Sequence, residues 1–142
     1  MAGKEHSLAD PFDIEVKDAY ILVRPHPGTV VNQELMVAMF HQLRALEAYR
    51  QDKEADLWDF RGCDTDLHYE DIARLMDDVR AGYDPHWTHE RTAVVVDADL
   101  LYGLSRVYQA LVSEFPIDIE IFRDVDRAVA WLESKQPPPE TA

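Results

Sequence analysis

Acidic side chains that could do chemistry lie where two predicted strands end. Asp59 and Asp97 each stand near the carboxyl end of an apolar run, where open α/β sheets place their ligand crevice. Carboxylates there can act as general acids or bases, or bind a metal ion. Asp97 and Asp99 also stand where the next helix should begin, and we interpret them as helix N-caps. A receiver-type phosphoacceptor role for Asp59 fails, because Phe122 is followed by Arg123 where such a site needs a lysine.

The single cysteine, Cys63, stands in a predicted loop. A reactive thiolate needs a basic neighbour or a helix terminus that lowers the thiol pKa. Arg61 and His68 are near in sequence, whereas Asp64 and Asp66 act in the opposite direction. We therefore interpret Cys63 as a structural residue.

Two histidines, His86 and His89, have the spacing of paired metal ligands. Two ligands are too few, and a third would have to come from His68, Cys63 or a carboxylate that nothing in the spacing requires. The sequence also lacks a G-x-S-x-G elbow, a G-x-G-x-x-G loop and a Walker lysine. We predict no catalytic residues, no metal and no cofactor, and we expect that the protein is not an enzyme.

Composition limits the classes of partner. The chain has 142 residues, 46% of them hydrophobic, and a formal net charge of −14, as expected of one acidic globular domain. This charge opposes binding to nucleic acid and to anionic membrane surfaces. No apolar run reaches the roughly 18 residues of a transmembrane helix, and the N-terminus lacks the apolar core of a secretory signal. We expect a cytoplasmic protein.

The hydrophobic pattern predicts a single α/β domain over residues 12–135, with flexible termini at 1–11 and 136–142. Its elements follow the order β-β-α-β-α-β-α-β-α, which favours a five-stranded, mostly parallel mixed sheet with an antiparallel first strand and four helices. Continuous apolar strands should lie inside this sheet and alternating strands at its edges. The predicted strands are Phe12–Val16, Tyr20–Val23, Ala55–Phe60, Thr92–Asp97 and Ile117–Phe122. The predicted helices begin after Asn32, near Glu70, at Asp99 and at Asp124.

Three features together resemble the small stand-alone STAS-like proteins. They are the antiparallel first strand, the helix after a Pro/Gly turn, and the run TAVVVD followed by a helix and the closing stretch IEIFRDVDRAVAWLES. These proteins are relatives of the anti-sigma-factor antagonists and are often described as STAS/SEC14-like. The resemblance covers roughly residues 12 to 134, and it implies the STAS-like fold and a dimeric state.

The resemblance also implies two kinds of site. In signalling members, a serine or threonine at the start of the helix after the third strand is phosphorylated. Here the Asp-Ser pair is missing, and Thr65 is the only hydroxyl between Phe60 and Tyr69. The SEC14-like side of the family implies a pocket for a small apolar ligand, and we assign it to the helix face that carries Met36, Met39, Phe40 and Leu43.

Three functional hypotheses follow. The first is a non-catalytic regulatory domain that contacts a protein partner, or a second copy in a homodimer, through the loop from Arg61 to Tyr69. The candidate contact residues in this loop are Arg61, Asp64, Thr65, Asp66, His68 and Tyr69. The alternative is a carrier or sensor of a small apolar ligand. The third is an enzyme that uses Asp59, Cys63 and His68 around one strand end.

Overall fold

The computed structural model describes residues 11–46, 55–82 and 90–134. Its main sheet has the strand order β1-β2-β4-β6-β7. β1 pairs antiparallel with β2, and the other three pairings are parallel. The strands of this sheet are β1 (Phe12–Val16), β2 (Ile21–Pro25), β4 (Ala55–Asp59), β6 (Glu90–Val95) and β7 (Ile117–Phe122).

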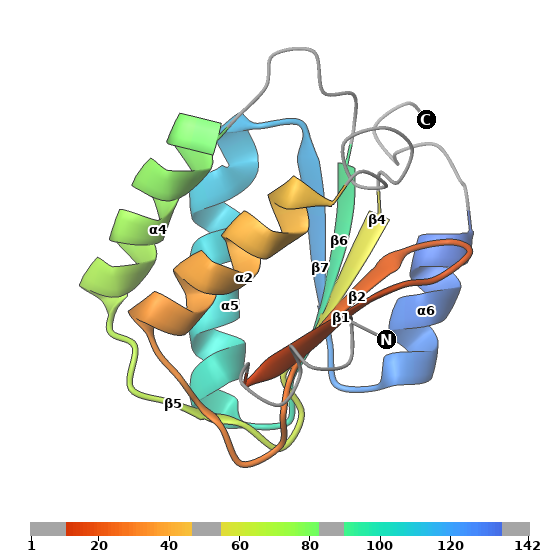
Figure 1. Ribbon diagram of the computed structural model, residues 1–142, viewed down its shortest axis with the longest axis horizontal. Helices are drawn as coiled ribbons and strands as arrows, with labels where there is room; N and C mark the ends of the chain where they lie inside the picture. Colours follow the sequence, from red (N-terminus) through yellow and green to blue (C-terminus); the bar gives the residue numbers. More distant parts are fainter. Residues whose placement is uncertain (1–10, 47–54, 83–89, 135–142) are drawn as a thin grey trace.

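The helices lie on both faces of the sheet, in unequal number (Figure 1). Of the helices that the structure describes, three cover one face and α6 covers the other. The three are α2 (Gln33–Ala45), α4 (Tyr69–Gly82) and α5 (Asp99–Leu111), which continues into the 3-10 turn η1 (Val112–Glu114); α6 spans Val125–Glu133. This arrangement gives the protein two cores, one on each side of the sheet.

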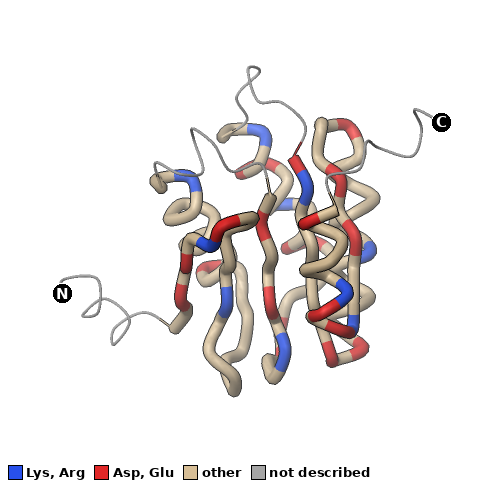
Figure 2. The backbone as a smooth tube through the Cα atoms, turned by 90° about the vertical axis from the view of Figure 1, so that its right-hand side faces the viewer, with Lys and Arg blue, Asp and Glu red and all other residues tan. Residues whose placement is uncertain are grey.

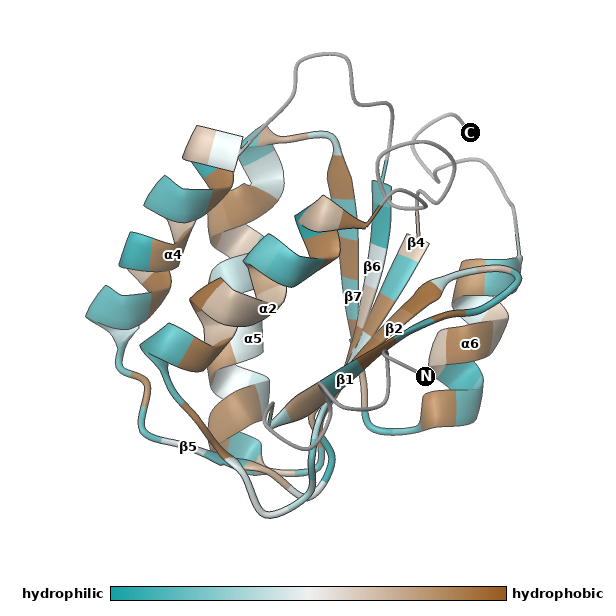
Figure 3. Cartoon of the chain, viewed as in Figure 1, coloured by the Kyte–Doolittle hydropathy of each residue, from teal (hydrophilic) through white to brown (hydrophobic). Residues whose placement is uncertain are grey.

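Strand alternation directs side chains into these two cores. Along β4, Trp58 joins the larger core under α2, α4 and α5, whereas Leu57 joins the smaller core under α6. Along β6, Val94 and Val95 divide in the same way. The helices are amphipathic to match, and Figure 3 shows this on α4, whose hydrophilic side faces away from the neighbouring helices. A single sheet therefore supports two independent apolar layers.

The structure confirms the predicted fold class. β1 and β2 form the predicted hairpin, β4 and β6 are interior strands, and β1 and β7 are the edges. Asn32 caps α2, because its Oδ1 accepts the N–H of Leu35 at 2.8 Å. Asp124 caps α6 in the same manner, accepting the N–H of Asp126 at 3.0 Å.

Two expectations about the start of α5 are wrong. Ala98 is the N-cap residue and makes no side-chain cap, so neither Asp97 nor Asp99 caps this helix. The Asp97 carboxylate instead accepts the N–H of Gly62 at 3.2 Å, and Asp99 pairs with Arg123 at 3.0 Å. Both carboxylates thus bind donors that are remote in sequence, and such contacts cannot be predicted from the spacing of neighbouring residues.

A small second sheet was not predicted from the sequence. β3 (Val30–Val31) and β5 (Asp64–Thr65) are two-residue strands that pair in parallel. They tie the turn before α2 to the loop before α4. Strands this short carry no readable alternation.

Charge and the chain ends complete the description. Acidic positions are spread over strands and helices, with basic positions among them (Figure 2). No helix of the described residues is long and apolar enough to cross a membrane. The predicted flexible termini lie outside the described residues except for Pro11.

Candidate functional site

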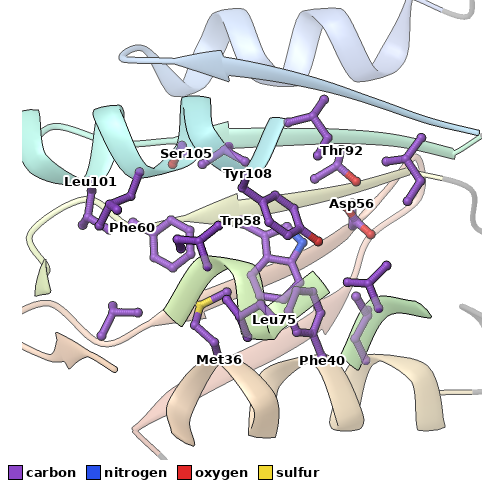
Figure 4. A pocket seen from close by; sticks show the side chains of 18 of the residues that line it. Met36, Phe40, Asp56, Trp58, Phe60, Leu75, Thr92, Leu101, Ser105 and Tyr108 are labelled. Carbon is purple, nitrogen blue, oxygen red and sulfur yellow. The ribbon is translucent and has the colours of Figure 1, made fainter. Parts of the chain in front are cut away.

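A cavity of about 100 Å³ lies between the sheet and the three helices that cover its larger core (Figure 4). Its floor comes from β4, β6 and β7, and its walls come from α2, α4 and α5. Most of the lining is apolar, and the polar lining groups include Arg44, Asp56, Glu90, Thr92, Ser105 and Tyr108. An apolar chamber with a few polar groups is the usual form of a small-molecule site.

Aromatic rings form one wall of the cavity. The Phe40 ring lies 5.1 Å from the Trp58 ring and 6.4 Å from the Tyr108 ring, measured between centroids. Phe60 continues the wall, with its ring centroid 6.3 Å from that of Trp58. The rings come from α2, from β4 and the residue that follows it, and from α5, so the wall forms only when helices and sheet pack together.

A buried acidic group lies at one end of this wall. Asp56 is only 1% exposed, and it is paired in register with Thr92 on the neighbouring strand. Glu90 precedes Thr92 by two residues and therefore lies on the same face of the sheet. The Asp56 side chain forms hydrogen bonds with the side chains of Glu90, Thr92 and Trp58. Its Oδ1 atom, also buried, has no hydrogen-bond partner among the described residues.

Burial governs the titration of this end of the cavity. Removal from water raises the pKa of Asp56, and the hydrogen bonds with Glu90, Thr92 and Trp58 oppose that rise only in part. The pKa of Tyr108 is raised by burial first and by the nearby carboxyl groups of Glu90 and Asp56 second. The cavity therefore favours a neutral phenol at Tyr108 and makes a charged Asp56 costly.

The basic group at the cavity, Arg44, is engaged elsewhere. Its Nη1 lies 3.3 Å from Oδ2 of Asp78, and its Nη2 donates to the Asp78 carbonyl oxygen at 3.3 Å. Its guanidinium carbon lies 5.5 Å from the centroid of the Phe40 ring. Arg44 thus joins α2 to α4 at the cavity wall.

The predicted ligand face on α2 coincides with the cavity in part. Met36, Phe40 and Leu43 line it, whereas Met39 is fully buried and is not one of the lining residues. Sequence analysis missed the polar end of the cavity, which Asp56 and Glu90 supply. The sequence does contain an indication of it: Asp56 alternates onto the same face of its strand as Trp58 and Phe60. A carboxylate on an apolar strand face is costly to bury, which marks the position as unusual.

The predicted partner loop begins with a tight ion pair. Arg61 donates from Nε and Nη2 to the two oxygens of the buried Asp59 carboxylate, at 2.9 and 2.8 Å. Gly62 follows with φ of +79°, and a Cβ there would lie 3.1 Å from Cβ of Pro27. Both oxygens of the Asp59 carboxylate therefore accept hydrogen bonds from Arg61.

Cys63 is buried in this loop. Burial raises the pKa of its thiol first, and the charges of Asp59 and Asp97 raise it further. These effects favour the protonated thiol, as the sequence analysis expects for a structural cysteine. His68, the third residue of the enzyme hypothesis, has an exposed side chain.

The Thr65 hydroxyl is held by the backbone on both sides. It donates to the carbonyl oxygen of Val31 at 2.7 Å and accepts the N–H of Leu67 at 3.0 Å. Phosphorylation would remove the hydroxyl hydrogen and with it the hydrogen bond to the Val31 carbonyl oxygen. Phosphorylation of Thr65 remains a prediction from the family resemblance.

The rest of the loop presents exposed side chains to solvent. Asp64, Asp66 and His68 are exposed, and Tyr69 is 60% exposed. The N–H of His68 is bound by the Asp71 carboxylate at 2.8 Å, which fixes the start of α4. This hydrogen bond is also the main cause that lowers the pKa of Asp71.

The remaining metal and aromatic candidates are only partly placed. His86, His89, Tyr83 and Trp87 lie outside the described residues. Within residues 11–46, 55–82 and 90–134, no three His, Cys, Asp or Glu side chains are grouped so as to hold a metal ion. Tyr102 lies beside Arg123, whose guanidinium carbon is 4.7 Å from the ring centroid.

Comparison with known proteins gives a structural likeness. No family model matches the chain, and no curated protein matches its sequence. A solved structure of an uncharacterized protein from the DUF3478 family, from Shewanella loihica PV-4 and with a SpoIIAA-like fold, is similar over 85% of this chain and 91% of its own. The two are 20% identical with a TM-score of 0.49. Within the described residues, this chain has a five-stranded mixed sheet with one antiparallel pair, and four α-helices.

Proposed function

We propose that this chain is a non-catalytic STAS-like domain that binds one small, mostly apolar molecule in the cavity between its sheet and the helices α2, α4 and α5. The observation that carries the proposal is the cavity itself, an apolar and aromatic chamber of about 100 Å³. At one end lies Oδ1 of Asp56, which has no hydrogen-bond partner among the residues that the structure describes. The domain would act as a carrier or a sensor of that molecule.

The size and lining of the cavity indicate the scale of the ligand. An apolar cavity of about 150 Å³ accepts a molecule the size of benzene. A chamber of comparable size, lined by Phe40, Trp58 and Tyr108, suits a single ring or a short branched chain. A ligand bound only by the native state raises the melting temperature by mass action.

A pocket-filling variant tests this proposal with benzyl alcohol as the probe. Ser105 lines the cavity and is half-buried, so Ser105→Phe should fill the chamber. We expect benzyl alcohol to raise the melting temperature of the wild type and of Ser113→Phe, a control at an exposed position, but not of Ser105→Phe. Leu104→Phe, at a second lining residue, is the alternative if Ser105→Phe does not fold. Equal shifts in all variants, or none in the wild type, would overturn the proposal.

A second candidate function, contact with a basic protein partner, is favoured by the exposed surface of the loop. Tyr69 is 60% exposed and stands close in sequence to the exposed carboxylates of Asp64 and Asp66. Aromatic residues beside charges are common at protein interfaces. The test is the affinity of a copurifying partner for a variant with Asp64→Asn, Asp66→Asn and Tyr69→Ala.

The control for this second test removes the same charge elsewhere. The control variant carries Glu120→Gln and Glu133→Gln, at two exposed positions, one on β7 and one on α6. Loss of affinity in the loop variant with none in the control would support the interface. Unchanged affinity in the loop variant would remove it.

A further inference from the structure

One oxygen atom at the polar end of the cavity determines what kind of ligand fits there. Asp56 is one of the lining residues and is only 1% exposed. Its side chain forms hydrogen bonds with Glu90, Thr92 and Trp58, but its Oδ1 atom has no hydrogen-bond partner among the described residues. A buried polar atom without a partner is costly, because it has lost its hydrogen bonds to water. A ligand that bonds to Oδ1 therefore gains affinity that a purely apolar ligand does not.

The aromatic wall of the cavity leads to this atom. Trp58 and Tyr108 line the cavity together with Asp56. Figure 4 shows the Tyr108 hydroxyl directed toward the Asp56 end, whereas Phe60 and Leu101 lie at the opposite end. A ligand whose apolar body packs against this wall can therefore carry one polar substituent at the Asp56 end and remain apolar at the other.

A hydroxyl is the neutral group that suits Oδ1 in both protonation states of Asp56. Burial raises the pKa of Asp56, which brings its carboxylic acid form closer to neutral pH. A hydroxyl donates to a carboxylate oxygen and accepts from a carboxylic acid, so it matches either form. It can also bond to the Tyr108 hydroxyl, which keeps its proton because burial raises its pKa. An ion costs far more than a neutral hydroxyl to transfer into an enclosed apolar cavity.

We propose that the ligand of this cavity is a small neutral alcohol or phenol, whose hydroxyl group bonds to Oδ1 of Asp56 and whose apolar body lies against the aromatic wall. This inference rests on the proposed function, because it names the chemical class of the molecule in the same site. An analogue with a methyl group in place of the hydroxyl leaves Oδ1 without a partner, and sites built around such a bond discriminate strongly against the analogue.

The test compares benzyl alcohol with ethylbenzene, in which a methyl group replaces the hydroxyl, by calorimetric titration of the full chain at pH 7. We expect the wild type to bind benzyl alcohol more tightly by roughly tenfold or more, although ethylbenzene is the more hydrophobic probe. Asp56→Leu removes the oxygen atom and should reverse this order while ethylbenzene still binds. Asp56→Val is the second variant if Asp56→Leu does not fold or does not bind ethylbenzene.

The control variant is Asp59→Asn. It removes the charge of the other buried aspartate of β4, which is paired with Arg61 and is not one of the lining residues. This variant should keep the preference for benzyl alcohol. A preference lost equally in Asp59→Asn would overturn the inference, because the loss of any buried carboxylate on β4 would then explain the change.

The remaining outcomes separate this inference from the proposal on which it rests. Ethylbenzene binding to the wild type as tightly as benzyl alcohol would overturn the hydroxyl while leaving an apolar site. An unchanged preference in the Asp56 variant would overturn it too, since the hydroxyl would then bond elsewhere. Binding of neither probe to the wild type would overturn the site and the hydroxyl together.

Discussion

Asp56 and Asp59 lie three positions apart on β4, and both are buried, but their carboxyl groups have different partners. Asp59 accepts two hydrogen bonds from the guanidinium of Arg61. Asp56 faces the cavity, contacts a second carboxyl group and leaves one oxygen unpartnered among the described residues. We therefore expect the aspartate at position 59 to stabilise the fold and the one at position 56 to destabilise it.

Asp56→Asn is expected to stabilise the empty protein near neutral pH, by roughly 1 kcal/mol, the usual scale of one buried polar interaction. Burial raises the pKa of Asp56 above its ordinary value of 3.8. Protonation of Asp56 therefore stabilises the folded protein. This stabilisation is fully present below pH 3.8 and is lost as the pH rises through the higher pKa of the folded state. Urea unfolding at pH 4, 6 and 8 should show a gap between variant and wild type that widens with pH. Parallel curves would contradict this account of Asp56.

Asp59→Asn is expected to act in the opposite direction. It removes the charge that holds Arg61, and we predict a loss of about 1 to 2 kcal/mol, moderated because the Arg61 side chain is partly exposed. The same urea experiment measures this loss. A neutral or stabilising effect would show that the ion pair contributes nothing to the fold.

At the scale of elements, the capping residues separate what local sequence predicts from what it does not. Asn32 and Asp124 cap the helices that follow them, as their types and positions predict. Asp99 has an equally suitable type, but it is the first residue of α5 and pairs with Arg123. The side chain of Asp99 is 95% exposed, so this pairing adds little to stability.

Two alanine substitutions test this difference. Asn32→Ala should lower the free energy of unfolding by about 1 kcal/mol, the typical cost of a lost N-cap. Asp99→Ala should change it by less than about 0.5 kcal/mol, as expected of an exposed surface position. Chemical denaturation of both variants at one pH measures the two effects. Equal losses would mean that Asp99 caps α5 after all.

Other elements follow from the sequence for clear physical reasons. The alternating charges of Ile117–Phe122 predict an edge strand, and the continuous apolar run from Thr92 predicts an interior one; both are confirmed. The β3–β5 pair could not be predicted, because each strand has only two residues and so shows no periodicity. The two segments are brought together by the turns at Gly28 and Gly62, where the N–H of Gly28 donates to the Gly62 carbonyl oxygen.

At the scale of the whole molecule, the cavity depends on how the layers are stacked. α2, α4 and α5 share one face of the sheet (Figure 1). Their side chains meet above β4 and β6 and leave a cavity between them (Figure 4). Sequence analysis identified most of the α2 face that lines this space. It could not identify the acidic end, since Asp56 and Glu90 are 34 positions apart in the chain and meet only through the pairing of β4 with β6.

The most direct test of the central claim is a native mass spectrum of the full chain, purified from its own cells without denaturation. We predict a fraction of the protein with one added mass of a small organic molecule, released on denaturation and absent from Ser105→Phe. A wild-type spectrum with the bare chain mass alone, across preparations at pH 6 and pH 8, would contradict the claim that this cavity holds a ligand.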